Sequence, residues 1–134
     1  MKANELQIGD IVIKRNKEPI CIFEIDDYRG VINNEPDGYD SETNINIDEI
    51  EPIPLTAEIL EKNGFKKTTD EKYYMCDDYS ELSAEEYSDS IWLICCADLE
   101  YNLPVQKIMV SYVHQFQQFL RLCGEENLAN HLTI

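Results

Sequence analysis

The chain has 134 residues, and its 27 Asp and Glu against 11 Lys and Arg give a formal net charge of −16 at pH 7. This charge repels phosphate backbones and anionic membrane surfaces. The short basic stretches at 14–17 and 62–67 stand beside acidic residues, so we expect no direct nucleic-acid binding. The apolar fraction of 43% is sufficient for a folded core, which argues against global disorder.

The cysteine pattern and the lack of long apolar runs bear on localisation. The longest apolar stretch, 91–97, is too short to cross a bilayer as a helix, and no run of signal-peptide length follows Met1. The five cysteines are an odd number, and none forms a Cys-x-x-Cys pair. We therefore predict a cytoplasmic protein that does not bind membranes and whose thiols are reduced and mostly buried.

The first half of the chain predicts several short strands. Stretches rich in β-branched residues at 11–13, 20–25, 31–32 and 44–47 alternate with turn-forming residues. The opening stretch 6–12, in which Gly9-Asp10 precedes an apolar strand, is similar to the entry strand of SH3-like barrels. Over residues 1–54 we expect a small SH3-like β-barrel or curled sheet.

A short helix over 57–63 has both ends specified by the sequence. Thr56 is a good N-cap, and Glu58 suits the positive end of the helix dipole. Gly64 supplies the left-handed residue after the last turn, and Phe65 can then contact Leu60.

The remainder, 55–134, predicts an antiparallel sheet and a C-terminal helix. Strands are expected at 65–69, 73–76, 90–96 and 105–110, with 90–96 central and buried on both faces. Apolar residues recur at helical spacing over 111–123, where Ser111 can cap the helix and Phe116 and Leu120 face the sheet. The tail from Glu125 to Ile134 is expected to form a short turn and a loosely held end. The fold class is α+β, with 1–54 and 55–134 packed as one compact unit.

Three stretches together resemble a known family. They are Ala3-Asn4-Glu5-Leu6 with Ile8-Gly9-Asp10, then 52–56 leading to Gly64-Phe65, and Tyr112-Val113-His114-Gln115 leading to Gly124-Glu125-Glu126. Their order is similar to short uncharacterised proteins of gut-bacterial chromosomes, prophages and mobile elements. That family has no assigned activity, ligand or catalytic residue, so the resemblance implies an architecture and not an enzyme.

The residues give little support to catalysis or to cofactor binding. The five glycines are too scattered for a phosphate-binding loop, and His114 and His131 are the only histidines. We interpret His114 as a partly buried structural residue of the last helix. Residues 33–38 begin like a calcium loop, but Asn44 stands where a bidentate Glu is needed. We therefore expect no enzyme, no cofactor and no metal site, with a small enzyme as a remaining alternative.

The acidic segment 77–89 is the candidate binding site. It contains six carboxylates, no Lys or Arg, and two tyrosines, and 83–86 within it fits a capping box for one helical turn. The candidate residues are Asp77, Asp78, Tyr79, Glu81, Glu85, Glu86, Tyr87 and Asp89. We predict a non-catalytic interaction module that docks on a basic protein partner. One alternative is a nucleic-acid mimic that blocks a DNA-binding protein, and another is that the charge only maintains solubility.

Overall fold

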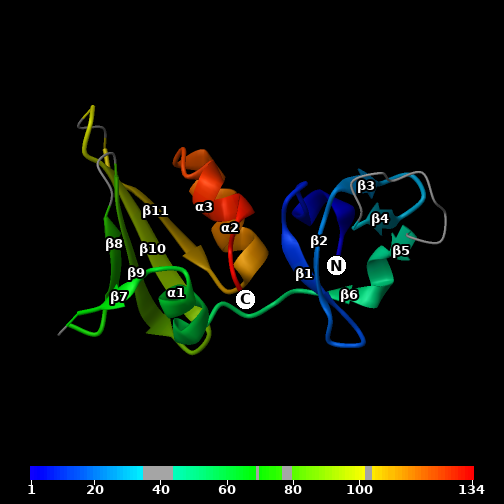
Figure 1. The fold of residues 1–134 in the computed structure, drawn as a ribbon, viewed down its shortest axis with the longest axis horizontal. Coiled ribbons are helices and arrows are strands. Elements are labelled where there is room, and N and C mark those ends of the chain that lie inside the picture. Colours follow the sequence, from blue (N-terminus) through cyan, green and yellow to red (C-terminus); the bar gives the residue numbers. More distant parts are fainter. Residues whose placement is uncertain (35–43, 69, 77–79, 102–103) are drawn as a thin grey trace. The chain divides into compact units, whose positions relative to one another are not determined.

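The computed structural model describes residues 1–34, 44–68, 70–76, 80–101 and 104–134. It divides the chain into two compact units, Met1–Ile53 and Pro54–Ile134, and each is described here by itself. Antiparallel sheets occur in both units, while the α-helices of the described residues belong to the second (Figure 1). The fold class is therefore α+β, as predicted.

The described residues of the first unit form two three-stranded antiparallel sheets. One has the order β2 (Pro19–Cys21), β1 (Ile11–Lys14) and β6 (Ile50–Glu51), and the other β3 (Glu24–Asp26), β4 (Val31–Asn33) and β5 (Asn44–Asn46). Among the described residues, the 3₁₀ turns Ala3–Glu5 and Ile47–Glu49 lie before β1 and after β5. The core of this unit is aliphatic and consists of Leu6, Val12, Ile20, Ile22, Ile32, Ile45, Ile47 and Ile50.

None of the sheets formed by the described residues closes into a barrel, so the SH3-like barrel is not confirmed. The stretch 20–25, predicted as one run, is interrupted at Ile22 and Phe23, which lie outside the strand ladders. Ile22 is fully buried, and its N–H donates to the carbonyl of Asp10. The next N–H, that of Phe23, donates to the Asn33 carbonyl of β4, so the chain passes from the first sheet to the second at this point.

The second unit is built on a five-stranded antiparallel sheet. Its order is β11 (Gln106–Val110), β10 (Ile91–Asp98), β9 (Ser80–Ser88), β8 (Tyr73–Cys76) and β7 (Lys66–Lys67). Along β10, Trp92, Ile94 and Cys96 are buried, whereas Leu93 and Cys95 are only half-buried. The expected burial of this strand on both faces is therefore wrong, because one face of the sheet is left without a covering layer of described residues.

Helix α1 (Ala57–Lys62) has the predicted ends. The Thr56 Oγ1 accepts a hydrogen bond from the Ile59 N–H at 3.2 Å. Gly64 has a φ of 94°, and the Phe65 N–H donates to the Leu60 carbonyl. The local signals for capping and termination are thus confirmed in detail.

Helix α2 (Val113–Leu122) buries Phe116 and Leu120 completely, which confirms the predicted packing of this helix. Its N-cap is Tyr112 and not Ser111. The reason is Gln115, whose Oε1 accepts from the backbone N–H groups of both Ser111 and Tyr112, at 2.9 and 3.2 Å. Figure 1 shows α2 together with α3 (Glu126–Asn130) on one side of the sheet.

The C-terminal tail is held in place, contrary to the expectation of a loose end. It forms α3, buries Ala129 and Leu132, and exchanges two hydrogen bonds of 2.8 Å between the Asn63 amide and the backbone of Thr133. A sequence pattern could not show this anchor, because the two residues are far apart in the chain. No helix in the described ranges has the length and apolar character needed to cross a bilayer.

Candidate functional site

The structure places most of the acidic segment on a strand. The expected helical turn at 83–86 is wrong, because β9 pairs with β8 on one side and with β10 on the other. Leu82 and Ala84 are buried, while Glu81 and Glu85 are exposed on the opposite face. The predicted site residues Asp77, Asp78 and Tyr79 lie outside the described residues.

A bulge near the end of β9 changes the direction of its side chains. Ser88 lies opposite Ile91 and Glu86 opposite Trp92, so Tyr87 is the extra residue, and its side chain is 68% exposed. A bulge bends its strand and re-aims the neighbouring side chains. Asp89 follows in the exposed β9–β10 turn. Glu85 and Glu86, which precede the bulge and are adjacent in sequence, both line the same cavity.

This cavity, of about 240 Å³, is the candidate site, and we name it the acidic pocket. Its lining combines four carboxylates, one lysine, two aromatic rings and the first residue of α1: Asp70, Glu71, Glu85, Glu86, Lys67, Tyr73, Trp92 and Ala57. Glu81, near the other end of β9, does not reach it. The structure thus brings together two of the predicted residues and adds two acidic residues from the β7–β8 turn.

Two aromatic side chains form the apolar part of the acidic pocket. The rings of Tyr73 and Trp92 meet edge to face, with centroids 5.9 Å apart and an interplanar angle of 68°. The Trp92 Nε1–H donates to the carbonyl of Leu55 at 2.9 Å, which fixes the indole. Both side chains are largely buried, so only a small part of each ring lines the pocket, and core packing fixes its position.

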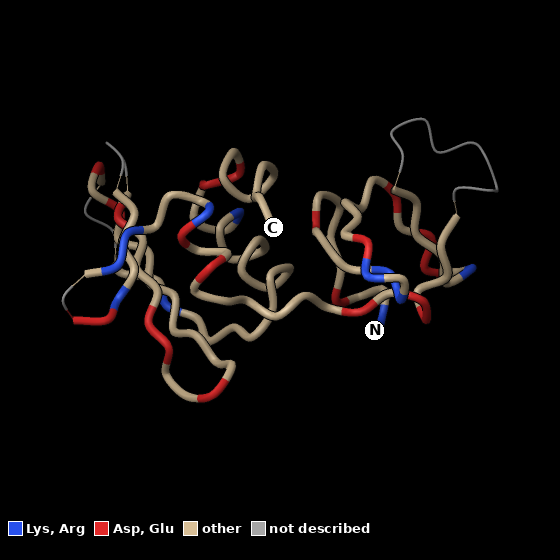
Figure 2. The backbone as a smooth tube through the Cα atoms, turned by 60° about the horizontal axis from the view of Figure 1, so that its bottom comes forward, with Lys and Arg blue, Asp and Glu red and all other residues tan. Residues whose placement is uncertain are grey.

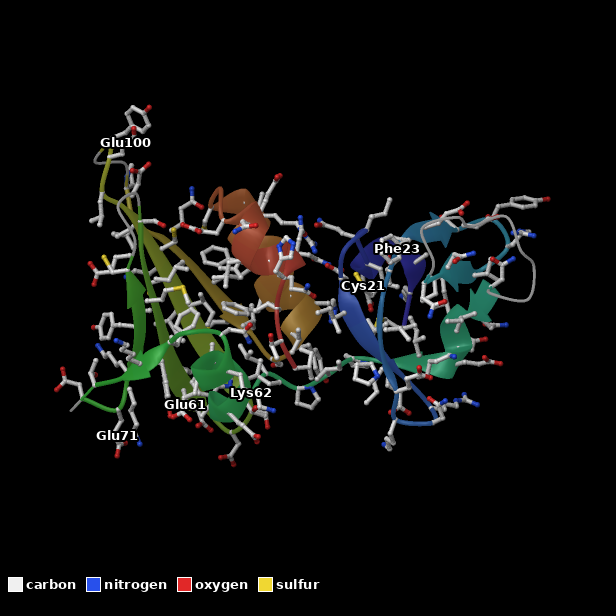
Figure 3. The ribbon with its side chains drawn as sticks, viewed as in Figure 1. Cys21, Phe23, Glu61, Lys62, Glu71 and Glu100 are labelled. Atoms are coloured by element: carbon white, nitrogen blue, oxygen red, sulfur yellow. The ribbon has the colours of Figure 1, made fainter. Side chains whose placement is uncertain are left out.

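The carboxylates of the acidic pocket are exposed and only partly balanced. The Lys72 Nζ lies 3.7 Å from a Glu85 carboxylate oxygen, and both side chains of this ion pair are more than one third exposed. Glu71 has a φ of 62°, a left-handed conformation that turns the chain tightly between β7 and β8. Figure 3 shows Glu71 at one end of the sheet and Glu100 at the other. The pocket therefore presents carboxylates beside an aromatic surface, an arrangement that attracts cations.

A second cavity of the same unit contains two cysteines. It measures about 310 Å³ and is lined by Ser80, Cys96, Asp98, Glu100, Cys123, Gly124 and Glu125. The Ser80 hydroxyl donates to the Glu125 carboxylate. Burial raises the pKa of the Cys123 thiol to about 12, and a hydrogen bond with Cys96 and the charges of Cys96 and Glu125 add to this effect. Cys123 is therefore protonated near neutral pH and lacks the thiolate that nucleophilic catalysis needs.

The largest of these cavities belongs to the first unit and has mixed charge. It measures about 530 Å³ and is lined by Lys2, Ala3, Asn4, Asp27, Arg29, Gly30, Asn46, Ile47 and Asp48. The Arg29 Nε lies 2.7 Å from an Asp26 carboxylate oxygen, and hydrogen bonds from Arg29 lower the pKa of Asp26. Because Lys2 and Arg29 place positive charge in its lining and no aromatic ring lies beside its carboxylates, size alone does not make this cavity the better candidate.

Other chemistries find little support in the described residues. They contain no group of three or more His, Cys, Asp or Glu arranged to hold a metal ion. The calcium-loop-like stretch 35–38 lies outside them. His114 is buried and stacks on Tyr112, with ring centroids 5.9 Å apart. This position agrees with the interpretation of His114 as a structural residue.

The β7–β8 turn is a part of the site that the sequence pattern does not predict. Residues 66–72 carry the signal of a tight turn between two strands, since Thr, Asp and Glu follow the lysines. The pairing of Lys67 with Tyr73, and of Tyr73 with Ala84, then brings this turn next to the end of β9. Only these pairings, which join distant parts of the chain, connect Asp70 and Glu71 with Glu85 and Glu86.

Comparisons with known proteins give no homologue from which a function could be transferred. No protein-family model, no curated protein and no solved structure matches the chain. The resemblance to short proteins of gut bacteria and mobile elements therefore stays a prediction. The geometry and charge of the acidic pocket are the observations that bear on function.

Proposed function

We propose that this protein is a non-catalytic interaction module whose acidic pocket binds a Lys or Arg side chain of a basic protein partner in the cytoplasm. The observation that carries the proposal is the convergence of Glu85 and Glu86 with Asp70 and Glu71 around Tyr73 and Trp92. Carboxylates pair with a guanidinium or an ammonium, and an aromatic ring accepts the cation or its aliphatic stem.

The size of the pocket and the charge of the chain fit this role. A cavity of about 240 Å³ is smaller than most small-molecule sites but has room for one long side chain. The net charge of −16 attracts a basic partner over a distance, which raises the association rate at low ionic strength. The carboxylates of the pocket are exposed. They can therefore pair with a cation of the binding partner without first breaking a buried ion pair within this protein.

The arrangement of β9 and its neighbours favours docking over mimicry of a nucleic acid. A mimic needs two rows of carboxylates at phosphate-like spacing on one face. On the exposed face of the sheet, Ser83 lies between Glu81 and Glu85. These two glutamates are four residues apart along an extended strand, a spacing of about 13 Å. The residues beside them in register are Tyr74, Cys76, Leu93, Cys95 and Ala97, none of which is acidic.

The test is the binding of arginine-rich and lysine-rich peptides to two variants of equal charge. Glu85→Gln with Glu86→Gln removes two carboxylates from the pocket, whereas Glu24→Gln with Glu51→Gln removes two exposed carboxylates from the first unit. We expect the pocket variant to associate about tenfold more slowly at low salt, with little change in the control. Equal binding by the two variants in stopped-flow or surface plasmon resonance measurements would show that only net charge matters and would refute the pocket.

A further inference from the structure

One stretch of this acidic chain contains no acidic residue. Residues 101–124 include none of the 27 Asp and Glu, and they form β11 and α2. This stretch is also rich in exposed apolar side chains. Ten large apolar side chains are exposed among the described residues, and five of them lie within 101–124: Tyr101, Val105, Ile108, Met109 and Leu122. Charge and exposure thus single out the same part of the second unit.

Strand β11 stands at the edge of the sheet. Among the strands that the structure describes, β11 pairs only with β10, so the backbone N–H and C=O groups on its other side have no strand partner. Val105 is 51% exposed and Met109 46% exposed. An exposed edge of this kind can pair with another strand unless charge, proline or a bulge prevents it. In β11 itself Lys107 is the one charged residue.

We propose that two copies of this chain associate by antiparallel pairing of their β11 strands, so that the two five-stranded sheets become continuous. A second copy is the partner that we assign to this edge, because neither molecule presents a carboxylate along β11. Two molecules of charge −16 repel each other, and the repulsion is smallest where neither presents a carboxylate. A basic partner, in contrast, gains no attraction from an edge that has no acid.

The register of the pairing follows from the position of Lys107. A twofold axis at Ile108 pairs all five residues of β11, placing Ile108 opposite its copy and Lys107 opposite Met109 of the second molecule. An axis at Lys107 would set two lysines face to face, which is unfavourable. Lys107 and Met109 lie on the face of the sheet away from the helices, because Ile94 and Trp92, on the same face as Ile108 and Val110, are buried.

This register gives a test in which two substitutions at one position act in opposite directions. Met109→Lys places a lysine opposite Lys107 of the other molecule, and the clash occurs twice in the dimer. We expect its dissociation constant to rise about tenfold. Met109→Glu places a carboxylate opposite the same lysine, so the dimer is retained or strengthened. The double variant Lys107→Glu with Met109→Lys recreates opposite charges and should restore association.

Sedimentation velocity over a range of concentrations measures the effect on the full chain, with Ile8→Lys as the control, since Ile8 is an exposed apolar residue of the first unit. Circular dichroism checks that each variant is folded. A chain that is monomeric at every concentration up to about 1 mM would overturn the proposal. A dimer that responds equally to Met109→Lys and Met109→Glu, or to neither, would overturn it as well.

Discussion

Strands β9 and β11 flank the same central strand and yet differ completely in charge. Both pair with β10 over five or more residues, and both place apolar residues on the buried face. Strand β9 carries Glu81, Glu85 and Glu86, whereas β11 has one lysine and no acid. Figure 2 shows how Asp and Glu recur along the rest of the chain. Pairing with β10 has the same structural requirements for both strands, so it does not explain the difference in charge. The difference therefore reflects the molecules that each exposed surface contacts.

Net charge is therefore a poor guide to the individual surfaces of this protein. A value of −16 suggests uniform repulsion, but the acidic residues avoid one continuous stretch of 24 residues. The same chain can therefore attract a basic partner at the acidic pocket and tolerate a second copy of itself at β11. Binding at the acidic pocket and association through β11 are separate properties, and each can be changed without the other.

The largest effect is expected at Trp92 of β10, a residue that lies beside both surfaces. Its indole packs on Tyr73 of the acidic pocket, and its backbone lies opposite Val110 of β11. Trp92→Ala should lower the free energy of unfolding by about 3–5 kcal/mol, because it leaves a large cavity and removes the hydrogen bond to Leu55. Urea denaturation measures this loss. A loss below about 1 kcal/mol would show that the indole is not part of the core.

Local and long-range features of this fold differ in how far sequence predicts them. Helix α1 is predictable because Thr56 and Gly64 specify its ends within one short stretch. Strand β9 is not, because Ser83 and Glu86 imitate a capping box, and only pairing with β8 and β10 makes the segment extended. The break at Ile22 and the anchor of Thr133 on Asn63 likewise depend on contacts that no local pattern encodes.

The candidate site shows the same limit. Glu85 and Glu86 were identified from the density of acidic residues alone. Asp70 and Glu71, which complete the acidic pocket, follow a different strand and come near only through the pairing of β7, β8 and β9. A count of charges along the sequence can find one side of such a pocket. It cannot find the residues on the other side of the pocket, because only strand pairing brings them near.

The second prediction is that salt acts on the two surfaces in opposite directions. Raising the ionic strength screens the attraction between the acidic pocket and a basic peptide, so this binding should weaken by about tenfold between 50 and 500 mM salt. The same screening reduces the repulsion between two acidic chains, so the dimer through β11 should become tighter. Fluorescence anisotropy and sedimentation velocity on one sample series measure both. A parallel response of the two equilibria would show that they do not use surfaces of different charge.

The smallest effect is expected at Cys123, where the stretch without acids ends and Glu125 begins the next acidic part of the chain. Burial is the largest cause of its raised pKa, a hydrogen bond with Cys96 is the next, and the charge of Glu125 is the smallest. The folded-state pKa of about 12 exceeds the reference value of 9.0, so the folded protein holds this proton more tightly than the unfolded chain does. This thiol therefore contributes stability that is fully present below about pH 9 and is lost as the pH rises toward 12.

At pH 8 iodoacetamide should label the exposed Cys76 well before Cys123, as mass spectrometry can show. Glu125→Gln should speed the labelling of Cys123 only slightly, because burial and Cys96 remain. Labelling of Cys123 as fast as that of Cys76 would mean that the thiol is not shielded by β10 and the end of α2.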